Sequence, residues 1–199
     1  MSPFRASIRQ IARKMETCEE WIELVRDLRE PIAVGPPPAD LHLRWAREQD
    51  LFAINALEGF VKETDFMAAS LRRGDRCLVL EDEDGIQAFT WVTFRDFKLA
   101  LWYTLALEAG ECYLVYIFVH PYFAGRGVGS WLLGKLMIEM RDLGAVRMIS
   151  GMYSNWHASF AMHTKLGFRI RRTLSQCRLL NIFPTPPKEV PEPVKASRE

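Results

Sequence analysis

The spacing of apolar residues divides the chain into a leading segment, a compact body and a tail. Five apolar residues recur at helical spacing and predict an amphipathic helix over residues 16–30: Trp21, Ile22, Leu24, Val25 and Leu28. Residues 31–40 hold four prolines and a glycine and are expected to form a linker. We therefore expect an N-terminal helix and linker over 1–40, a domain over 41–182 and a tail over 183–199.

The first half of the body predicts a short strand, one or two helices and then two strands, over residues 41–45, 48–73, 77–80 and 86–94. Gly74 suits the end of the helical part as a C-cap. The Asp84-Gly85 pair favours a tight hairpin turn, so the two strands are expected to pair antiparallel.

The second half of the body predicts strand, helix, strand, helix and strand, over residues 113–119, 131–143, 146–153, 156–166 and 168–180. The first of these strands is apolar on both faces and belongs in the middle of a sheet. Gly144 closes the long helix. Together with the antiparallel first half, this order predicts a mixed sheet with helices packed on it.

Length and composition limit the class of protein. A chain of 199 residues with 49% hydrophobic residues has material for one compact domain and short appendages. The 26 basic residues nearly balance the 25 acidic ones, so no nucleic-acid partner is expected. The longest apolar runs are less than half of the ~20 residues that a membrane helix needs, so no membrane span is expected.

The cysteines and the two ends add expectations about location. Cys18, Cys77, Cys112 and Cys177 lack metal-ligand spacing, so we expect reduced core thiols, a cytoplasmic protein and no metal. The basic N-terminus faintly resembles a transit peptide, and an exposed basic helix turn is the favoured interpretation: it carries Arg5, Arg9, Arg13 and Lys14. The tail after Phe183 has five prolines and is expected to be disordered.

A glycine-rich turn joins the predicted central strand to the long helix. The first turn of a helix has unpaired N–H groups and a partial positive charge, and glycines let its backbone approach a phosphate. Ser130 stands where the dinucleotide fingerprint needs a third glycine, and the P-loop GK[ST] triplet is absent. The turn therefore predicts a phosphate site of another type, with Arg126 as an added cation. The alternative is a turn that only permits tight packing.

These residues resemble the GCN5-related N-acetyltransferase (GNAT) family over about residues 41–180. Gly127 and Gly129 match the two small positions of the family's cofactor motif, and residues 158–168 resemble its second signature. Ala124 replaces the usual Arg or Gln, a loss for which Arg126 partly compensates. Asn155 lies one residue early for the family's asparagine.

The resemblance implies an α/β (α+β) fold, with a mixed, mostly antiparallel central sheet flanked by helices. It also implies acetyl-CoA, or another acyl-CoA, as cosubstrate. The residues expected to bind it are Ile117, Phe118, Val119, Gly125, Arg126, Gly127, Val128, Gly129, Ser130, Asn155 and Ser159.

The resemblance further implies direct acyl transfer to a primary amine. The oxyanion would meet a backbone N–H near Phe118 or Val119, where the family's strand is bulged. His163 stands at the position of the family's proton-donating tyrosine, and Tyr153 is the substitute. A histidine with no catalytic task is an equal alternative. Glu111 is the candidate general base, although a surface carboxylate or a water relay would also fit this stretch.

The acceptor is expected to be a small-molecule or peptide amine. An aromatic insert over residues 94–107 would wall an apolar pocket, although a hairpin that packs on the core or forms a homodimer contact is favoured. Two other functions stay open. One is a non-catalytic coenzyme-A-binding sensor. The other is an acyl-carrier-protein-dependent acyltransferase that docks its carrier on a basic patch: Arg169, Arg171, Arg172 and Arg178.

Overall fold

The computed structural model of the chain describes residues 16–38, 40–57, 64–100, 103–179, 183–184 and 188–190. Within them, a nine-stranded sheet has the order β10-β9-β1-β8-β7-β4-β3-β2, with β11 beside β9. Its strands are β1 (Glu16–Asp27), β2 (His42–Trp45), β3 (Arg76–Asp82), β4 (Gly85–Thr93), β7 (Glu111–Val119), β8 (Arg147–Tyr153), β9 (Arg169–Leu179), β10 (Phe183–Pro184) and β11 (Lys188–Val190). A separate hairpin joins β5 (Phe97–Ala100) to β6 (Tyr103–Leu105).

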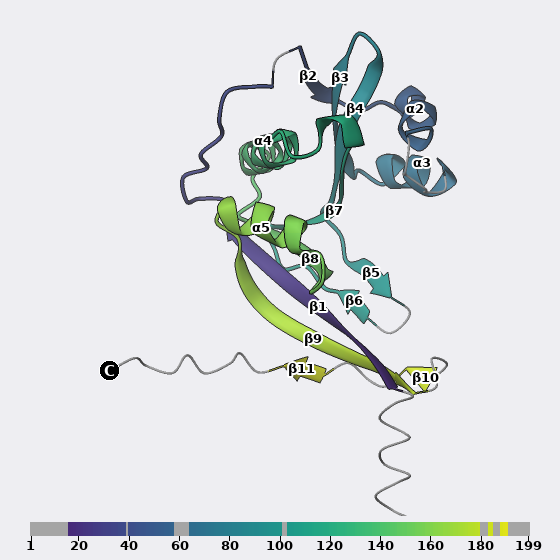
Figure 1. Cartoon of the computed structure of the whole chain (residues 1–199), viewed down its shortest axis with the longest axis vertical. Helices are drawn as coiled ribbons and strands as arrows, with labels where there is room; N and C mark the ends of the chain where they lie inside the picture. The colour runs from purple at the N-terminus through teal and green to yellow at the C-terminus, as the bar shows by residue number, and fades with distance from the viewer. Residues whose placement is uncertain are drawn as a thin grey trace, which may run out of the picture.

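Helices cover both faces of the sheet (Figure 1). The long helix α4 (Val128–Asp142) and α5 (His157–Lys165) lie on one side. The short helices α2 (Leu51–Asn55) and α3 (Thr64–Arg72) and the β5–β6 hairpin lie on the other. Two 3-10 turns, η1 (Glu48–Asp50) and η2 (Pro121–Phe123), precede α2 and α4. No helix among the described residues is long and apolar enough to cross a membrane.

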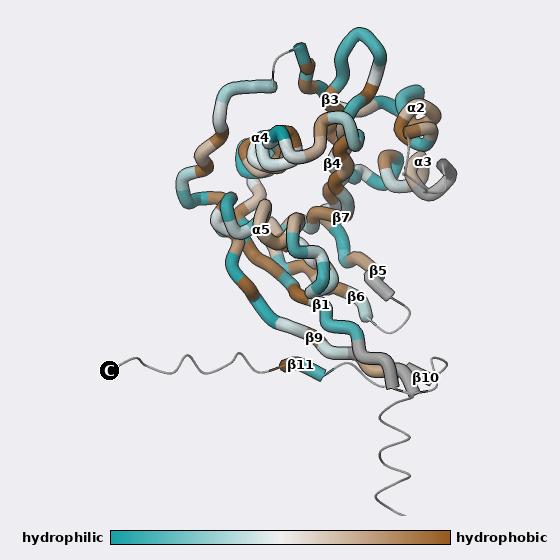
Figure 2. The backbone as a smooth tube through the Cα atoms, viewed as in Figure 1, coloured by the Kyte–Doolittle hydropathy of each residue, from teal (hydrophilic) through white to brown (hydrophobic). Residues whose placement is uncertain are grey.

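The strand pairing confirms the expected mixed, mostly antiparallel sheet. Strands β7 and β8 pair parallel, and the other pairings in the described part of the chain are antiparallel. The apolar β4 and β7 run through the middle of the molecule, as Figure 2 shows. Because β7 is covered on both faces, its sequence is apolar at nearly every position.

The core has a different set of side chains on each face of the sheet. Leu132, Leu133 and Leu136 of α4 are fully buried against one face. Phe89 and Ile54 belong to the cluster under α2 and α3 on the opposite face. Burial of each such side chain contributes roughly 1.5–3 kcal/mol, so both layers hold the central strands in place.

The predicted helix over residues 16–30 is wrong, because residues 16–27 form β1. This strand lies between β8 and β9 and uses both of its faces. Leu24 packs in the α4-side cluster, whereas Val25 packs beside the β5–β6 hairpin. A short apolar run that is buried on both faces can match helical spacing by chance, which explains the error.

The tail and the cysteines also differ from expectation. Residues 183–184 and 188–190 add two short strands to β9, so these parts of the expected disordered tail are ordered. Cys77 and Cys112 are buried free thiols, as expected. Cys177 is disulfide-bonded, and the register of β1 and β9 places Cys18 opposite it. The expectation of four reduced thiols is therefore wrong. The basic N-terminal turn (residues 1–15) and residues 191–199 lie outside the described residues.

Candidate active site

The parallel strands β7 and β8 pair along only part of their length. Their register runs from Glu111 opposite Arg147 to Leu114 opposite Ser150. Beyond this last pair, β7 continues to Val119 and β8 continues to Tyr153 without pairing to each other. The two strands therefore enclose a gap in the middle of the sheet.

Backbone groups of β7 face this gap. The N–H of His120 donates to the carbonyl oxygen of Gln87 at 2.8 Å, so position 120 faces β4. Backbone groups alternate between the two edges of a strand, so Ile117 and Val119 direct their N–H and C=O groups toward β8. The gap thus offers an extended ligand a strand edge with which it can form main-chain hydrogen bonds.

A bulge interrupts β7 at the start of the gap. Tyr116 pairs with Trp91 and Leu114 pairs with Val92, so Val115 is the extra residue. A bulge leaves one residue out of the ladder and re-aims its neighbours. The expected bulge at Phe118 or Val119 is therefore misplaced, because an unbroken run of good strand formers gives no signal for the position of a bulge.

The glycine turn lies at the far end of β7. Gly125 and Gly127 have φ of 73° and 82°, which favours glycine, and no atom lies within 4 Å of a Cβ built on either. The first helical bond in α4 runs from the N–H of Trp131 to the oxygen of Gly127 at 2.9 Å. The N–H groups of Val128, Gly129 and Ser130 precede it, as in helix starts that bind phosphate. The residues present therefore fit a pyrophosphate group.

Arg126 is fixed beside this turn by aromatic contact. Its guanidinium carbon lies 4.4 Å from the centre of the Tyr122 ring. Arg126, Gly127 and Ser130 line a second hollow together with the proline-rich segment 33–38 and Lys165. Two cations therefore border the groove that leads away from the helix start.

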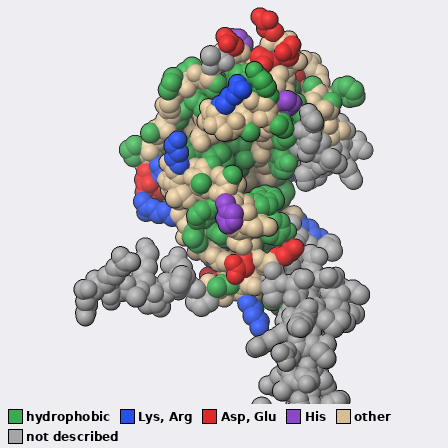
Figure 3. Space-filling view, viewed as in Figure 1, with side chains coloured by type: hydrophobic (Ala, Val, Ile, Leu, Met, Phe, Trp, Pro, Cys, Tyr) green, Lys and Arg blue, Asp and Glu red, His purple; other side chains and the backbone are tan. Residues whose placement is uncertain are grey.

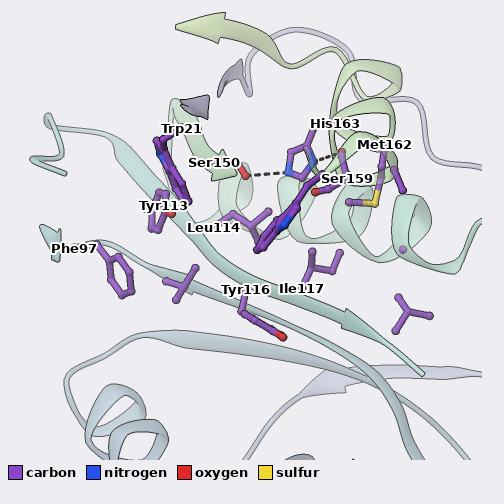
Figure 4. A pocket seen from close by; sticks show the side chains of 16 residues that line it. Trp21, Phe97, Tyr113, Leu114, Tyr116, Ile117, Ser150, Ser159, Met162 and His163 are labelled. Carbon is purple, nitrogen blue, oxygen red and sulfur yellow. Dashed lines mark hydrogen bonds between the residues drawn. The ribbon is translucent and has the colours of Figure 1, made fainter. Parts of the chain in front are cut away.

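A pocket of about 520 Å³ occupies the gap between the strands. On the helix side it is lined by Gly129 of α4 and by Ser159, Met162 and His163 of α5, and at the strands by Ile117, Val119 and Ser150. On the hairpin side it is lined by Trp21, Phe97, Tyr113 and Gly151. Figure 4 shows Ser150, Ser159, Met162 and His163 on one side of the cavity and Trp21, Phe97 and Tyr113 on the other. The pocket therefore passes through the sheet and has two chemically different ends.

His163 is buried at the helix-side end of the pocket. It is 1% exposed, and its Nδ1 lies 2.8 Å from the carbonyl oxygen of Ser159. Its Nε2 lies 2.9 Å from Oγ of Ser150, and its ring packs edge-on against Phe168. Burial lowers the pKa of His163, while the bond to Ser159 acts in the opposite direction. The ring is therefore neutral at neutral pH.

The structure places the other expected catalytic residues apart from the pocket. Glu111 is buried at the paired end of β7, where its Oε1 lies 3.2 Å from Arg147 and 3.4 Å from Arg171. Tyr153 packs edge-on against Trp21 behind the pocket wall. Asn155 lines a separate surface hollow. Glu111 and Tyr153 are not brought to the site, and neither is Asn155, an expected cofactor-binding residue. Among the expected catalytic groups, His163 therefore lines the pocket.

Most of the expected cofactor residues fall into two groups, one at the pocket and one at the helix start. Ile117, Val119, Gly129 and Ser159 line the pocket. The others expected on the turn lie at the helix start, where Val128 is buried in the core. Phe118 faces away from the pocket and stacks on Phe89, with ring centres 5.6 Å apart.

The sequence gives no indication of three residues that shape the pocket: Trp21, Ser150 and Gly151. Trp21 lies on the strand that was predicted to be helical. Gly151 faces the Trp21 ring so closely that a Cβ would lie 2.4 Å from its Cζ2. No sequence signal marks Ser150, whereas Phe97 belongs to the aromatic insert for which a role as a pocket wall is one of the expectations.

The insert over residues 94–107 both packs on the core and reaches the pocket. Leu105 is fully buried next to Tyr113, and Phe97 lines the cavity. Leu101 and Trp102 lie outside the described residues. Tyr103 donates to Oε2 of Glu23 at 2.9 Å, and Arg172 binds the same oxygen at 3.0 Å. The hairpin is therefore anchored to the sheet by a buried polar cluster.

Three of the arginines in the expected carrier-docking patch are engaged in ion pairs. Arg172 binds Glu23, and Arg171 lies within 3.5 Å of both Glu23 and Glu111. Arg169 pairs with Glu30 at 3.3 Å. The side chain of Arg178 lies outside the described residues. On the face in Figure 3, charged side chains are scattered in small groups, and many hydrophobic ones gather in the middle.

Comparison with protein families identifies this architecture. The model of the Acetyltransferase (GNAT) family matches residues 39–168, and the chain belongs to that family. Among curated proteins, it is 38% identical over 60 residues to the L-amino acid N-acyltransferase MnaT of Escherichia coli. It is 37% identical over 60 residues to an L-methionine sulfoximine/L-methionine sulfone acetyltransferase of Salmonella typhimurium. Each match covers 30% of this chain and 35% of the relative, so the chain spans about a third of their length.

Solved structures share the fold at low sequence identity. A GCN5-related N-acetyltransferase from Sphaerobacter thermophilus matches with a TM-score of 0.64 and 13% identity, over 88% of this chain and 56% of that one. The ribosomal-protein-S18-alanine N-acetyltransferase from Escherichia coli matches with a TM-score of 0.53 and 19% identity. The second match covers 65% of this chain and 77% of the other. These likenesses concern the fold.

Proposed function

We propose that this chain is an acetyl-CoA-dependent N-acetyltransferase that moves the acetyl group directly to a primary amine. One observation carries the proposal. The pocket begins at Gly129 in the first turn of α4, follows the open edge of β7 and reaches a titratable residue, His163, while other residues of the glycine turn line a second hollow. A phosphate cradle, an extended thioester arm and a reacting carbonyl would fit these three parts in order.

The cosubstrate would be held mainly by backbone groups. The pyrophosphate would accept hydrogen bonds from the first turn of α4, and the pantetheine amides would pair with Ile117 and Val119. Arg126 and Lys165 border the neighbouring groove and would face further phosphate charge. Gly129 keeps the channel open, because a Cβ there would lie 3.2 Å from Sδ of Met162 and 3.5 Å from Val119.

The acceptor would enter from the hairpin side and carry an apolar or aromatic body. Trp21, Phe97 and Tyr113 form that end of the pocket. Nε1 of Trp21 is buried and has no hydrogen-bond partner among the described residues, so one acceptor atom on the amine would satisfy it. The names of the two curated relatives make L-amino acids, L-methionine sulfone among them, the first acceptors to test.

The two other functions have weaker support. The ion pairs of Arg171 and Arg172 leave little free charge for docking an acidic acyl carrier. A sensor that binds coenzyme A without turnover would not need His163 in the pocket wall. We accordingly place both behind direct acetyl transfer.

A thiol-release assay tests the proposal. Acetyl-CoA would be offered with L-methionine sulfone, L-phenylalanine, phenylethylamine and a short peptide with a free N-terminus, and the product would be identified by mass. N-acetylation of at least one of these amines is expected. Binding without turnover of any amine would favour the sensor, and faster transfer from an acyl carrier would favour the carrier-dependent enzyme. Absence of any acyl-CoA binding would overturn all three.

A further inference from the structure

The contacts of His163 define which of its nitrogens carries the proton. The carbonyl oxygen of Ser159 can only accept a hydrogen bond, so Nδ1, at 2.8 Å, is the protonated nitrogen. In the neutral ring, Nε2 then has a free lone pair. It lies 2.9 Å from Oγ of Ser150, so the serine hydroxyl donates to it. The imidazole is thus set to take a proton from Ser150.

Ser150 stands at the point where the strands separate. It forms the last pair between β8 and β7, opposite Leu114, and its neighbour Gly151 is the first residue of β8 that faces the gap. Both residues line the pocket, whose helix-side and hairpin-side ends meet there. A serine hydroxyl at this junction would therefore lie between the thioester and the incoming amine.

Few other titratable groups face the same space. From β7, Tyr113 and Tyr116 line the pocket, and burial raises the pKa of both, so they stay neutral. No Asp, Glu, Lys or Arg is among the described residues that line it. From β9 and its approach, Phe168 is the side chain in ring contact with His163. Thus His163 is the pocket group whose unperturbed pKa lies nearest neutrality.

We propose that Ser150 and His163 form one proton relay that acts first as the general base and then as the general acid of the reaction. The proposal rests on the proposed function and supplies the base that the sequence did not reveal. As the amine nitrogen bonds to the acetyl carbon, it gives a proton to Oγ of Ser150, whose own proton moves to Nε2 of His163. When the carbon–sulfur bond breaks, Nε2 returns its proton to Oγ, and Ser150 protonates the leaving sulfur.

The proton balance closes without another reactant. The amine enters as the free base, after its ammonium proton has passed to solvent. One proton then leaves the nitrogen and one arrives on the sulfur, and both side chains end in their starting states. Between the two steps His163 carries a positive charge next to the carbonyl of Ser159, which accepts from Nδ1–H throughout. A neutral starting ring is required, because an imidazolium could not accept the first proton.

Kinetics of single and double variants test the relay. Ser150→Ala and His163→Gln are each expected to lower kcat about 100-fold, in the range of general acid–base catalysis, while acetyl-CoA affinity changes less than about twofold. Because the two groups act as a unit, the double variant should be about as slow as either single one. His157→Gln, at the exposed start of α5, is the matched control and should leave kcat unchanged. A variant that keeps more than half of wild-type kcat, or losses that multiply in the double variant, would overturn the relay.

Two measurements on the wild-type protein do not depend on the variants folding. Nitrogen-15 spectra of the imidazole should show Nδ1–H and an unprotonated Nε2 at neutral pH, and kcat should fall with acidification below pH 6.5 as His163 takes up a proton. The opposite tautomer, or a kcat that is constant through this acidic range, would contradict the relay. If the wild-type protein is active and the variants have the same kcat, the relay alone is overturned. If the wild-type protein binds no acetyl-CoA, the proposed function and the relay fail together.

Discussion

The two halves of the β7–β8 pair differ in how their polar groups are used. In the paired half, Glu111 is enclosed by Arg147 and Arg171, and the strands satisfy each other's backbone groups. In the open half, Ile117 and Val119 present backbone groups to a gap, and Ser150 and His163 meet at its edge. Glu111 thus has a structural role. The candidate chemistry depends instead on the neutral side chains of Ser150 and His163 and on backbone groups of β7 that do not pair with β8.

The largest expected effect lies in the paired half and concerns stability alone. Glu111→Ala removes a fully buried carboxylate from two arginines, and we expect a loss of about 2–3 kcal/mol in the free energy of unfolding. Because Glu111 lies outside the pocket, kcat should stay within about twofold of wild type. Urea unfolding and steady-state kinetics measure the two effects. A large loss of kcat in a folded variant would restore Glu111 as the general base.

The next effect concerns the end of the open half, at the start of α4. Gly127→Ala adds a Cβ where the pyrophosphate would lie and should weaken acetyl-CoA binding about tenfold, which corresponds to about 1.4 kcal/mol. Gly144→Ala is the matched control, because Gly144 has φ of 93° at the other end of the same helix. Each variant should lose about 1–2 kcal/mol of stability from its left-handed backbone. Calorimetric titration would contradict the site if both variants bound equally well.

A smaller effect is expected at the first open residue of β8. Gly151→Ala would push the Trp21 ring away, because the new Cβ would lie 2.4 Å from Cζ2. We expect the KM for the amine to rise about fivefold while acetyl-CoA affinity stays unchanged. Gly110→Ala provides a contrast at the paired end, where a Cβ would lie 3.1 Å from Cγ2 of Val146. An equal rise in KM for both variants would show that general loosening of the sheet causes it.

The smallest effect is a pH dependence of stability. Burial lowers the pKa of His163 below its ordinary 6.5, so the unfolded chain binds the proton more readily than the folded one. The contribution of His163 to stability is therefore complete above pH 6.5 and is lost as pH falls through the lower folded pKa. Unfolding midpoints of wild type and His163→Gln should converge in this range. Parallel curves would show that His163 is not the group responsible.

The sequence predicted much of the body of the fold because its strands and helices have distinct periods. The alternation of β3 and β4, the helical face of α4 and the glycine turn were placed correctly. Strand β1 was mistaken for a helix because both of its faces are buried. The tail strands escaped prediction because prolines and charges dominate residues 183–190, and their order comes from pairing with β9.

The candidate site was predictable only in part. The glycine turn and His163 were found because their residue types have specific chemistry at those positions. Ser150, Trp21 and Phe97 come from β8, β1 and β5, and only the tertiary arrangement brings them to one cavity. Glu111 has a carboxylate, which suits a general base, and lies on the strand that borders the site. It lies, however, where β7 and β8 are paired. Local sequence does not reveal where two paired strands separate.

Amide chemical-shift mapping with acetyl-CoA tests the central claim most directly, because it reports where the ligand binds. We expect saturable changes at the backbone amides of Ile117, Val119 and the first turn of α4, and little change over residues 111–113 in the paired half. Binding that instead perturbs the paired half or the hairpin face, or titration without any change in the open half, would contradict the account.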